Sequence, residues 1–244
     1  MIILALENYR AVWSNNGMKK LYIALRRAGH QTALLGAVLF SSTAIAGESP
    51  STVVELFTSQ GCSSCPPAND FVAGISDDAD KLVLTYGVTY WDYLGWKDTF
   101  GDPAFTSRQR AYGKAFGIGN VYTPQIVLNG SAHSPRYSKR DVETMTLSQN
   151  NVPVDLSEKD GKLVLETAAA AVVVTYKPGS QSVPVKAGEN HGRTLDIANV
   201  VMDVKTVAAG DVLDLAVEPG LAYAAIVHDA KTRKVISASV YRPE

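Results

Sequence analysis

Short apolar runs separated by polar turns are the main feature of residues 53–150. A run of four to eight apolar residues that ends at a turn is typical of a buried strand, whereas apolar residues spaced three and four apart are typical of a helix. Proline pairs favour the first turn of a helix, where no backbone donor is needed. The pair Asn129-Gly130 is a strong hairpin signal. Together these patterns predict strands at 53–57, 81–86, 125–128 and 131–134, and helices at 65–76, 103–116 and 138–149.

The pattern changes near residue 150, and beyond it strand-like runs alternate with turn signals such as Asp160-Gly161 and Pro178-Gly179. Many short strands at this spacing predict an antiparallel sandwich or barrel. The runs lie at 154–156, 163–167, 172–176, 183–186, 195–207, 212–217, 222–228 and 235–240.

Both cysteines of the chain, Cys62 and Cys65, follow the first predicted strand as a Cys-x-x-Cys motif. If Ser63 or Ser64 caps the helix that comes next, the positive end of the helix dipole points at both sulfurs. A thiolate is stabilised there, and the thiolate is the reactive form of cysteine. Strand, motif and helix together are the thioredoxin-like redox arrangement.

The predicted order of elements is β-α-β-α-β-β-α followed by strands alone. We therefore predict an α/β thioredoxin-like domain over residues 47–150 and an all-β, sandwich-like domain over residues 151–244. Residues 1–46 are interpreted as an N-terminal extension and signal peptide, with an apolar core at 33–40 and a small-x-small cleavage pattern at 44–46. The apolar core is shorter than the roughly 20 residues that span a bilayer.

Cleavage of this segment predicts a periplasmic or secreted protein without a stable membrane span, and an uncleaved membrane anchor is the alternative. The hydrophobic share of 46% supports a sizeable core, and the net charge of −1 gives no electrostatic reason to expect nucleic-acid binding. In an oxidising compartment the two cysteines are expected to form a disulfide. Because they stand only three residues apart, the closed loop is tiny, which favours a redox couple over a structural staple.

Thr123-Pro124 directly precedes the predicted strand at 125–128. A proline at this place in a thioredoxin-like fold is cis and faces the Cys-x-x-Cys motif. A cis X–Pro bond is the minority form in folded proteins. It would hold the Thr123 backbone beside the sulfurs, where a bound chain could pair with it as an added strand. An ordinary trans proline at the entry to a strand is the alternative.

Five runs of the sequence carry a resemblance to a known family: VELFTSQGCSSCPPAN, YWDYLGWKDTF, FTSRQRAYGKAFG, VYTPQIVLNG and GENHGRTL. On these runs, which span about residues 53–198, the chain resembles the exported bacterial family called "domain of unknown function 1223". That family is similar to thioredoxins in fold, and no activity is settled for it. The resemblance therefore implies a thioredoxin-like fold and export, and it leaves the reaction open.

Similarity to thioredoxin-like sites implies roles for three residues. Cys62 would be the accessible nucleophile, and Cys65 would be the resolving thiol that breaks a mixed disulfide. An inert disulfide or a pair of buried thiols is the alternative. Glu55 would match the buried carboxylate of thioredoxins, and burial would raise its pKa and suit it to general acid–base work. A partly exposed Glu55, or one paired with Arg or Lys, is the alternative.

Aromatic residues of the segment 90–98, which has no clean period and is predicted as a loop, could form an apolar lip that receives a substrate. Core or inter-domain packing is the alternative. Asp92, Lys97 and Asp98 are interpreted as loop charges. The candidate substrate-binding residues are Trp91, Tyr93, Trp96 and Tyr122.

The polar segment 189–194 holds a Glu, a His and an Arg and could bind an anion or a metal, with a turn or domain contact as the alternative. His133 and His228 are interpreted as structural. The sequence offers no Cys/His set with the three or four ligands of a zinc site, and no cofactor is predicted.

Three functions fit these observations. The first is an exported thiol–disulfide oxidoreductase that acts on protein or small-molecule thiols and disulfides. The second is a non-catalytic thioredoxin-like binding module. The third is a copper-handling protein that uses Cys62, Cys65 and a histidine, since soft thiolates favour Cu(I).

Overall fold

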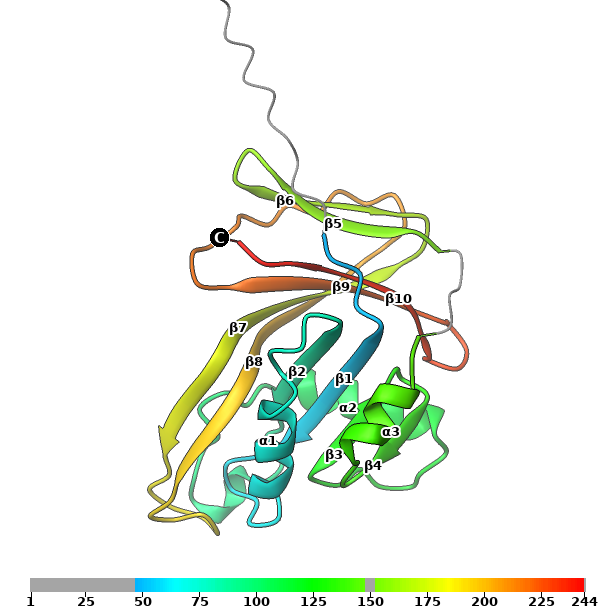
Figure 1. Ribbon diagram of the computed structural model, residues 1–244. Helices are drawn as coiled ribbons and strands as arrows, with labels where there is room; N and C mark the ends of the chain where they lie inside the picture. The colour runs from blue at the N-terminus through cyan, green and yellow to red at the C-terminus, as the bar shows by residue number, and fades with distance from the viewer. Residues whose placement is uncertain (1–46, 148–151, 244) are drawn as a thin grey trace, which may run out of the picture. The chain divides into compact units, whose positions relative to one another are not determined.

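The computed structural model describes residues 47–147 and 152–243 (Figure 1). The predicted signal peptide and the predicted boundary between residues 150 and 151 lie outside the described residues. The helices are α1 (Pro66–Ala73), α2 (Pro103–Ala115), α3 (Lys139–Thr144) and a 3₁₀ turn at Asp92–Leu94. The strands are β1 (Thr52–Thr58), β2 (Lys81–Gly87), β3 (Gln125–Leu128), β4 (Ala132–Ser134), β5 (Val154–Lys159), β6 (Lys162–Thr167), β7 (Ala171–Pro184), β8 (Thr194–Val207), β9 (Ala222–His228) and β10 (Val235–Tyr241).

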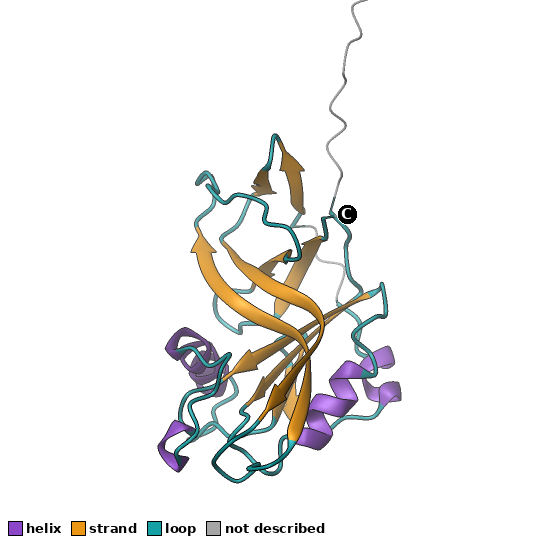
Figure 2. Cartoon of the chain, turned by 90° about the vertical axis from the view of Figure 1, so that its left-hand side faces the viewer, coloured by secondary structure: helices purple, strands orange, loops and turns teal. Residues whose placement is uncertain are grey.

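Eight of these strands form one mixed sheet in the order β10-β9-β7-β8-β2-β1-β3-β4, and β5 and β6 form a separate hairpin. β1 and β2 are parallel, and β1 pairs with β3 antiparallel. Within the sheet, the two halves of the chain are joined by a parallel pairing of β2 with β8 at Thr85 and Val200. Beside it, the Asn199 side chain donates to the Val83 carbonyl at 3.1 Å. Figure 2 shows how strongly this sheet twists.

The predicted fold class, an α/β thioredoxin-like domain followed by a separate all-β sandwich, is wrong. The protein is mostly β, with only three short α-helices among the described residues, and strands from both predicted regions share one sheet. The physical reason is the edge of β2. An unpaired strand edge presents free N–H and C=O groups, and the long β7–β8 hairpin covers this edge instead of folding apart from it. Apolar runs predict strands but not which strand pairs with which.

β1 is buried on both faces because it lies inside the sheet with packing on each side. On one face, Val54 and Leu56 pack with residues of α1 and α3. On the other face, Val53 and Phe57 pack with α2 and, because the sheet curls, with residues of β9 and β10. Side chains alternate along a strand, so Glu55 points to the α2 side. The turn after β1 carries both cysteines, and its place is fixed by this central strand.

Most predicted strands and helices are present, with two errors in the second half. The run 172–176 and the first two residues of the run 183–186 belong to one strand, β7, because the predicted turn at Pro178-Gly179 is a bulge opposite β8. Gly179 takes a φ of +75° there and donates its N–H to the Asn199 side chain. The run 212–217 forms no strand and makes one isolated bridge, from Ala216 to β6. Among the described helices, none combines the length and the hydrophobicity of a membrane span.

Candidate functional site

Cys62 and Cys65 form a disulfide in the turn between β1 and α1, with their Cα atoms 5.5 Å apart. Two tight turns place them, since Cys62 N–H donates to the Ser59 carbonyl and Cys65 N–H donates to the Cys62 carbonyl. Cys65 is the N-cap residue of α1, and Pro66 takes the first helical position, where a missing donor is tolerated. The predicted caps at Ser63 or Ser64 therefore stand one or two residues too early, but the motif lies at the positive end of the helix as predicted.

The prediction that Cys62 is exposed is wrong. Both Cys62 and Cys65 have 0% of their surface exposed. The nearest hydroxyl to Cys62 is that of Ser64, 3.3 Å from the sulfur, and Ser64 itself is exposed. The disulfide therefore lies just beneath the surface of the protein, under a cover that the sequence did not reveal.

The peptide bond between Thr123 and Pro124 is cis, which confirms that prediction. The Thr123 carbonyl accepts a hydrogen bond from the Ser64 hydroxyl at 3.4 Å, so this turn lies against the Cys-x-x-Cys motif. The Thr123 hydroxyl accepts a 2.7 Å hydrogen bond from the Trp91 indole. The structure thus brings Thr123, Pro124 and Trp91 together with the disulfide loop.

The other predicted substrate-binding aromatics do not gather into a lip. Tyr93 is 78% exposed. Trp96 packs on a small cluster made of Val185 and residues of β8, and it donates its indole N–H to the Gln60 side chain at 2.9 Å. The Tyr122 hydroxyl is 2.7 Å from His133 Nδ1. The aromatic residues of 90–98 therefore differ in their surroundings: Trp91 and Trp96 are partly buried and donate hydrogen bonds, whereas Tyr93 lies on the surface.

An apolar pocket of about 520 Å³ lies beside the motif instead, between α1, the Thr123-Pro124 turn and the segment after β4. No pattern in the sequence predicts this pocket, because its walls come from three separate parts of the chain. Arg136 is the one charged residue in its lining. The pocket is lined by Ser64, Pro67, Ala68, Phe71, Thr123, Pro124, Ile126, Pro135, Arg136 and Tyr137.

Glu55 is fully buried, and its partners lie on α2 and β9. Arg108 Nε donates to the Glu55 carboxylate at 2.7 Å, and the Tyr112 hydroxyl donates to its other oxygen. His228 Nε2 lies 3.2 Å from an Arg108 nitrogen and 3.1 Å from the Tyr112 hydroxyl. We call these four residues the Glu55 cluster.

Burial on its own would raise the pKa of Glu55, but the charge and hydrogen bond of Arg108 outweigh it and lower the pKa below its ordinary value. The prediction of a raised pKa is therefore wrong. Burial and the Arg108 charge lower the pKa of His228 to about 3, so His228 is neutral and its Nε2 accepts from Arg108. Glu55 is paired with an arginine, which is the alternative considered for it from the sequence. Its side chain faces away from α1, and the Glu55 cluster joins β1, α2 and β9.

Asp98 is buried, with 4% of its surface exposed, and the interpretation of it as a loop charge is wrong. Its carboxylate accepts from the Gln60 N–H at 2.7 Å and from the Phe100 N–H at 2.9 Å. Burial raises the pKa of Asp98 to about 6 in spite of these hydrogen bonds. Asp98 thereby fixes the backbone two residues before Cys62.

The polar segment that begins at Glu189 reaches the motif. Asn190 is fully buried, and its side-chain nitrogen donates to the Gln60 and Cys62 carbonyls at 3.0 and 2.8 Å. The Glu189 carboxylate accepts from the Ser63 N–H at 2.9 Å, and this hydrogen bond lowers its pKa. The segment 189–194 therefore makes contacts with the disulfide loop, in line with the turn or domain contact considered as the alternative.

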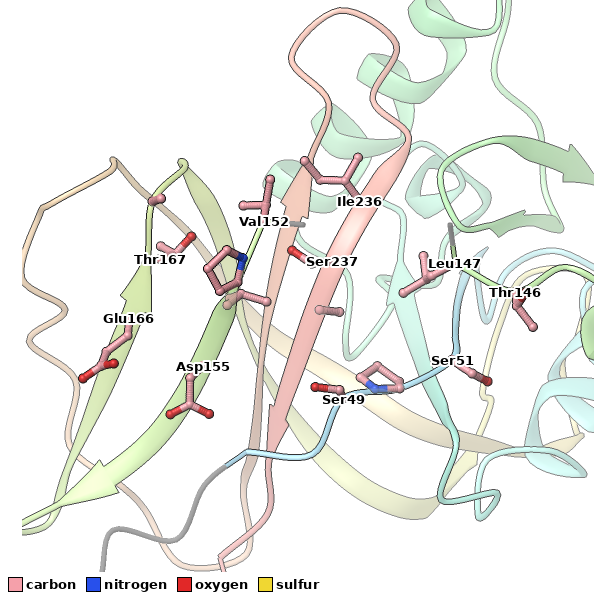
Figure 3. A pocket seen from close by; sticks show the side chains of 15 residues that line it. Ser49, Ser51, Thr146, Leu147, Val152, Asp155, Glu166, Thr167, Ile236 and Ser237 are labelled. Carbon is pink, nitrogen blue, oxygen red and sulfur yellow. The ribbon is translucent and has the colours of Figure 1, made fainter. Parts of the chain in front are cut away.

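Among the described residues, no group of three or more His, Cys, Asp or Glu side chains is arranged to hold a metal ion. The copper hypothesis therefore has no third ligand in this part of the chain. A further pocket, of about 950 Å³, lies between β5, β6 and β10 (Figure 3). Its lining includes Leu147 and Val152, which flank residues outside the described part of the chain, so we assign no site there.

Comparison with known proteins gives a family and a fold. The crystal structure of a protein from Agrobacterium tumefaciens matches with 32% identity and a TM-score of 0.61, over 79% of this chain and 94% of that chain. A protein named HBP35 from Porphyromonas gingivalis matches at 13% identity with a TM-score of 0.50, over 80% and 76% of the two chains, which shows likeness of fold alone. No curated protein matches. The profile described as "Protein of unknown function (DUF1223)" matches residues 53–236, and the chain therefore belongs to this family.

Proposed function

We propose that the protein is a thiol–disulfide oxidoreductase whose redox couple is the Cys62–Cys65 disulfide. The observation that carries the proposal is the place of this bond. It closes a loop with a sequence separation of three at the start of α1, and it lies against the Thr123–Pro124 turn. A loop so short gives little entropic stabilisation of the fold, so structural need alone does not account for it.

The electrostatics of the turn support reactivity at both sulfurs. Cys65 caps α1, and Cys62 lies one turn earlier, so both sulfurs are near the positive end of the helix dipole. The Ser64 hydroxyl lies 3.3 Å from the Cys62 sulfur, and by turning its proton away from the Thr123 carbonyl it can donate to a thiolate there. Both features stabilise the anionic form that exchange requires.

Exchange moves two electrons from a partner dithiol to the Cys62–Cys65 disulfide. A thiolate of a partner dithiol attacks the Cys62 sulfur, the bond to Cys65 breaks, and Cys65 leaves as a thiolate that takes up a proton. The second partner thiol, after losing its proton, then attacks the partner sulfur of the mixed disulfide and releases Cys62 as a thiolate. The partner loses two electrons and forms a disulfide, and the Cys62–Cys65 pair gains them. The reverse sequence reduces a partner disulfide.

The apolar pocket beside the motif supports a partner with an apolar segment near its reacting sulfur. Phe71, Tyr137 and Pro135 supply apolar walls, and Arg136 stands in its lining. The pocket touches both Ser64 and Pro124, so a chain seated there lies next to the disulfide loop. Burial of apolar surface in such a pocket holds a partner while the sulfurs exchange.

The test is capture of a mixed disulfide. In Cys65→Ala the resolving thiol is gone, so a partner disulfide attacked by Cys62 stays attached to it. We expect covalent adducts with an unfolded disulfide-containing test protein, which dithiothreitol removes, and none with Cys62→Ala/Cys65→Ala. Absence of adducts with a folded Cys65→Ala variant contradicts the proposal.

One observation favours a second candidate, a binding module in which the disulfide is only structural. Both sulfurs are fully buried, which suits a bond that never exchanges. This candidate predicts that Cys62→Ser/Cys65→Ser leaves ligand binding intact and that Cys65→Ala captures nothing. The capture experiment therefore separates the two functions.

We also propose export with cleavage after Ala46, which makes Gly47 the first residue of the processed chain. Gly47 donates its N–H to the Asp155 carboxylate at 3.2 Å, and Figure 3 shows Asp155 on β5 near the start of the described chain. A Cβ on Gly47 would lie 2.5 Å from the Leu156 carbonyl oxygen, so only glycine fits. After cleavage this nitrogen is an ammonium group, and its contact with Asp155 becomes charge-assisted.

Intact-mass measurement of protein from the periplasmic or extracellular fraction tests this. We expect a chain that begins at Gly47, and a mass that includes earlier residues contradicts the proposed cleavage. In the processed chain, Asp155→Asn should lower the melting temperature more than Glu166→Gln, a matched change at an exposed carboxylate on the neighbouring strand.

A further inference from the structure

The segment between β7 and β8, residues 185–193, lies over the disulfide loop, and we call it the lid. It connects Pro184 and Thr194, which are paired at the ends of the two strands. Hydrogen bonds within the segment shape it, including Val185 N–H to the Arg193 carbonyl at 2.8 Å and its counterpart from Gly192 N–H to Val185 at 2.9 Å. Figure 1 shows β7 and β8 running past α1 toward the end of the sheet where the motif lies.

Asn190 anchors the lid to the motif. Its side-chain nitrogen spans the carbonyls of Gln60 and Cys62, and its side-chain oxygen accepts from Arg193 at 3.1 Å. Asn190 has 0% of its surface exposed, so these hydrogen bonds are made out of contact with water. A buried amide with every contact satisfied holds one arrangement of the lid in preference to others.

Two further contacts close the lid. Glu189 accepts from the Ser63 N–H, which lies between the two cysteines. Gly188 takes a φ of +75°, and a Cβ built there would lie at ordinary van der Waals distance from the Gly61 Cα, at 3.6 Å, and from the Trp96 Cβ, at 3.4 Å. The lid therefore contacts the backbone before and after Cys62, at Gln60 through Asn190 and at Ser63 through Glu189.

We propose that the lid controls access to the Cys62–Cys65 disulfide and must lift before either sulfur can exchange. This rests on the proposed function, because only a bond that exchanges needs controlled access. An attacking thiolate has to reach a sulfur, and both sulfurs are fully buried with the lid closed. The anchors of Asn190 and Glu189 end on backbone groups that water or an incoming chain can satisfy once the lid has lifted.

The experiment measures how fast dithiothreitol reduces the disulfide in the full protein. Each turnover moves two electrons and two protons to Cys62 and Cys65 and leaves dithiothreitol as a cyclic disulfide. Free thiols are trapped with a maleimide and counted by mass. The wild-type rate should lie well below that of the same disulfide in urea-unfolded protein.

Asn190→Ala removes both anchoring hydrogen bonds and should speed reduction about tenfold, which is the change in an opening equilibrium that one or two hydrogen bonds make. Glu189→Ala should speed it by a smaller factor. His191→Ala, a change at an exposed side chain of the same lid, should reduce at the wild-type rate. Far-ultraviolet circular dichroism and the melting temperature show whether each variant is folded.

The lid proposal is overturned if folded Asn190→Ala and Glu189→Ala are reduced within twofold of the wild-type rate, or if wild type is reduced as fast as unfolded protein. Should Asn190→Ala fail to fold, the reduction rate of Glu189→Ala decides, and a rate within twofold of the wild-type rate overturns the proposal. The outcome is separate from that of the proposed function. A lid that gates dithiothreitol in a protein that captures no partner refutes the function alone, and partner capture with no effect of the lid variants refutes the lid alone.

Discussion

Glu55→Gln is the substitution whose effect follows most directly from the structure. The change keeps the shape of the side chain but leaves Arg108 charged, with 7% of its surface exposed and no carboxylate beside it. Removing one partner of a buried ion pair costs about 3–5 kcal/mol, because the other charge stays buried. For a protein of this size, that lowers the melting temperature by roughly 6–20 °C, at about 2–4 °C per kcal/mol.

The assay is equilibrium unfolding in guanidinium chloride at pH 7, with the disulfide intact. Glu166→Gln, at an exposed strand position, is the matched control and should change the free energy of unfolding by less than about 0.5 kcal/mol. Arg108→Met should also be strongly destabilising. The double variant Glu55→Gln/Arg108→Met should lose less than the sum of the two single changes, since the pair interacts directly.

The ion pair of Glu55 and Arg108 also makes stability depend on pH. The folded-state pKa of Glu55 lies below its ordinary value, so its stabilisation is present above pH 4.5 and is lost as the pH falls further. Glu55→Gln should remove this acid-dependent loss. A loss of less than about 1 kcal/mol in Glu55→Gln at pH 7 would refute the account of the Glu55 cluster.

Three further predictions concern buried titrating groups and one turn. His228 has a folded pKa of about 3 against an ordinary value of 6.5, so stability falls as the pH drops from 6.5 toward 3, and His228→Gln should flatten that slope by one proton. Asp98 changes stability with pH in the opposite direction, because its folded pKa is about 6 against an ordinary value of 3.8. Its stabilisation is present below pH 3.8 and is lost as the pH rises to 6. Asp98→Asn should remove that loss, and an unchanged slope of stability against pH counts against the burial of Asp98. Gly130→Ala would place a Cβ 2.3 Å from the Arg233 carbonyl oxygen and should cost more than about 3 kcal/mol in chemical unfolding. Gly161→Ala, also at positive φ but facing open space, should cost only about 1 kcal/mol, and equal losses would show that the close approach is unimportant.

Local signals in the sequence predicted local structure well. Asn129-Gly130 forms the expected hairpin turn, with φ of +50° and +59°, because both positions need the left-handed region that these residues tolerate. The disulfide between Cys62 and Cys65 was predicted from the expected oxidising compartment, and the cis bond at Pro124 from the place of this proline before a strand in a thioredoxin-like order of elements.

Long-range pairing could not be predicted in the same way. The pairing of β8 with β2 brings residues more than one hundred positions apart together, and no apolar pattern encodes that choice of partner. The same limit explains the site. Asn190 is buried against the Gln60 and Cys62 carbonyls only because the β7–β8 hairpin reaches the motif, and its local sequence does not show this contact.

Glu55 shows that the type of a residue and its burial do not by themselves predict the direction of its pKa shift. An acid in an apolar strand predicts burial correctly, but its pKa depends on the partner. Arg108 lies on α2, 53 positions further along the chain, and nothing in the sequence near Glu55 shows that α2 places a guanidinium against it.

The reduction potential of the Cys62–Cys65 couple tests the central claim most directly. The protein is equilibrated under argon in dithiothreitol and glutathione buffers of known potential until the forward and reverse approaches agree, and the reduced fraction is counted by maleimide mass labelling. A redox couple that works in exchange should titrate between about −120 and −270 mV, the range of catalytic disulfides. A potential below about −300 mV, typical of structural disulfides, would contradict the account.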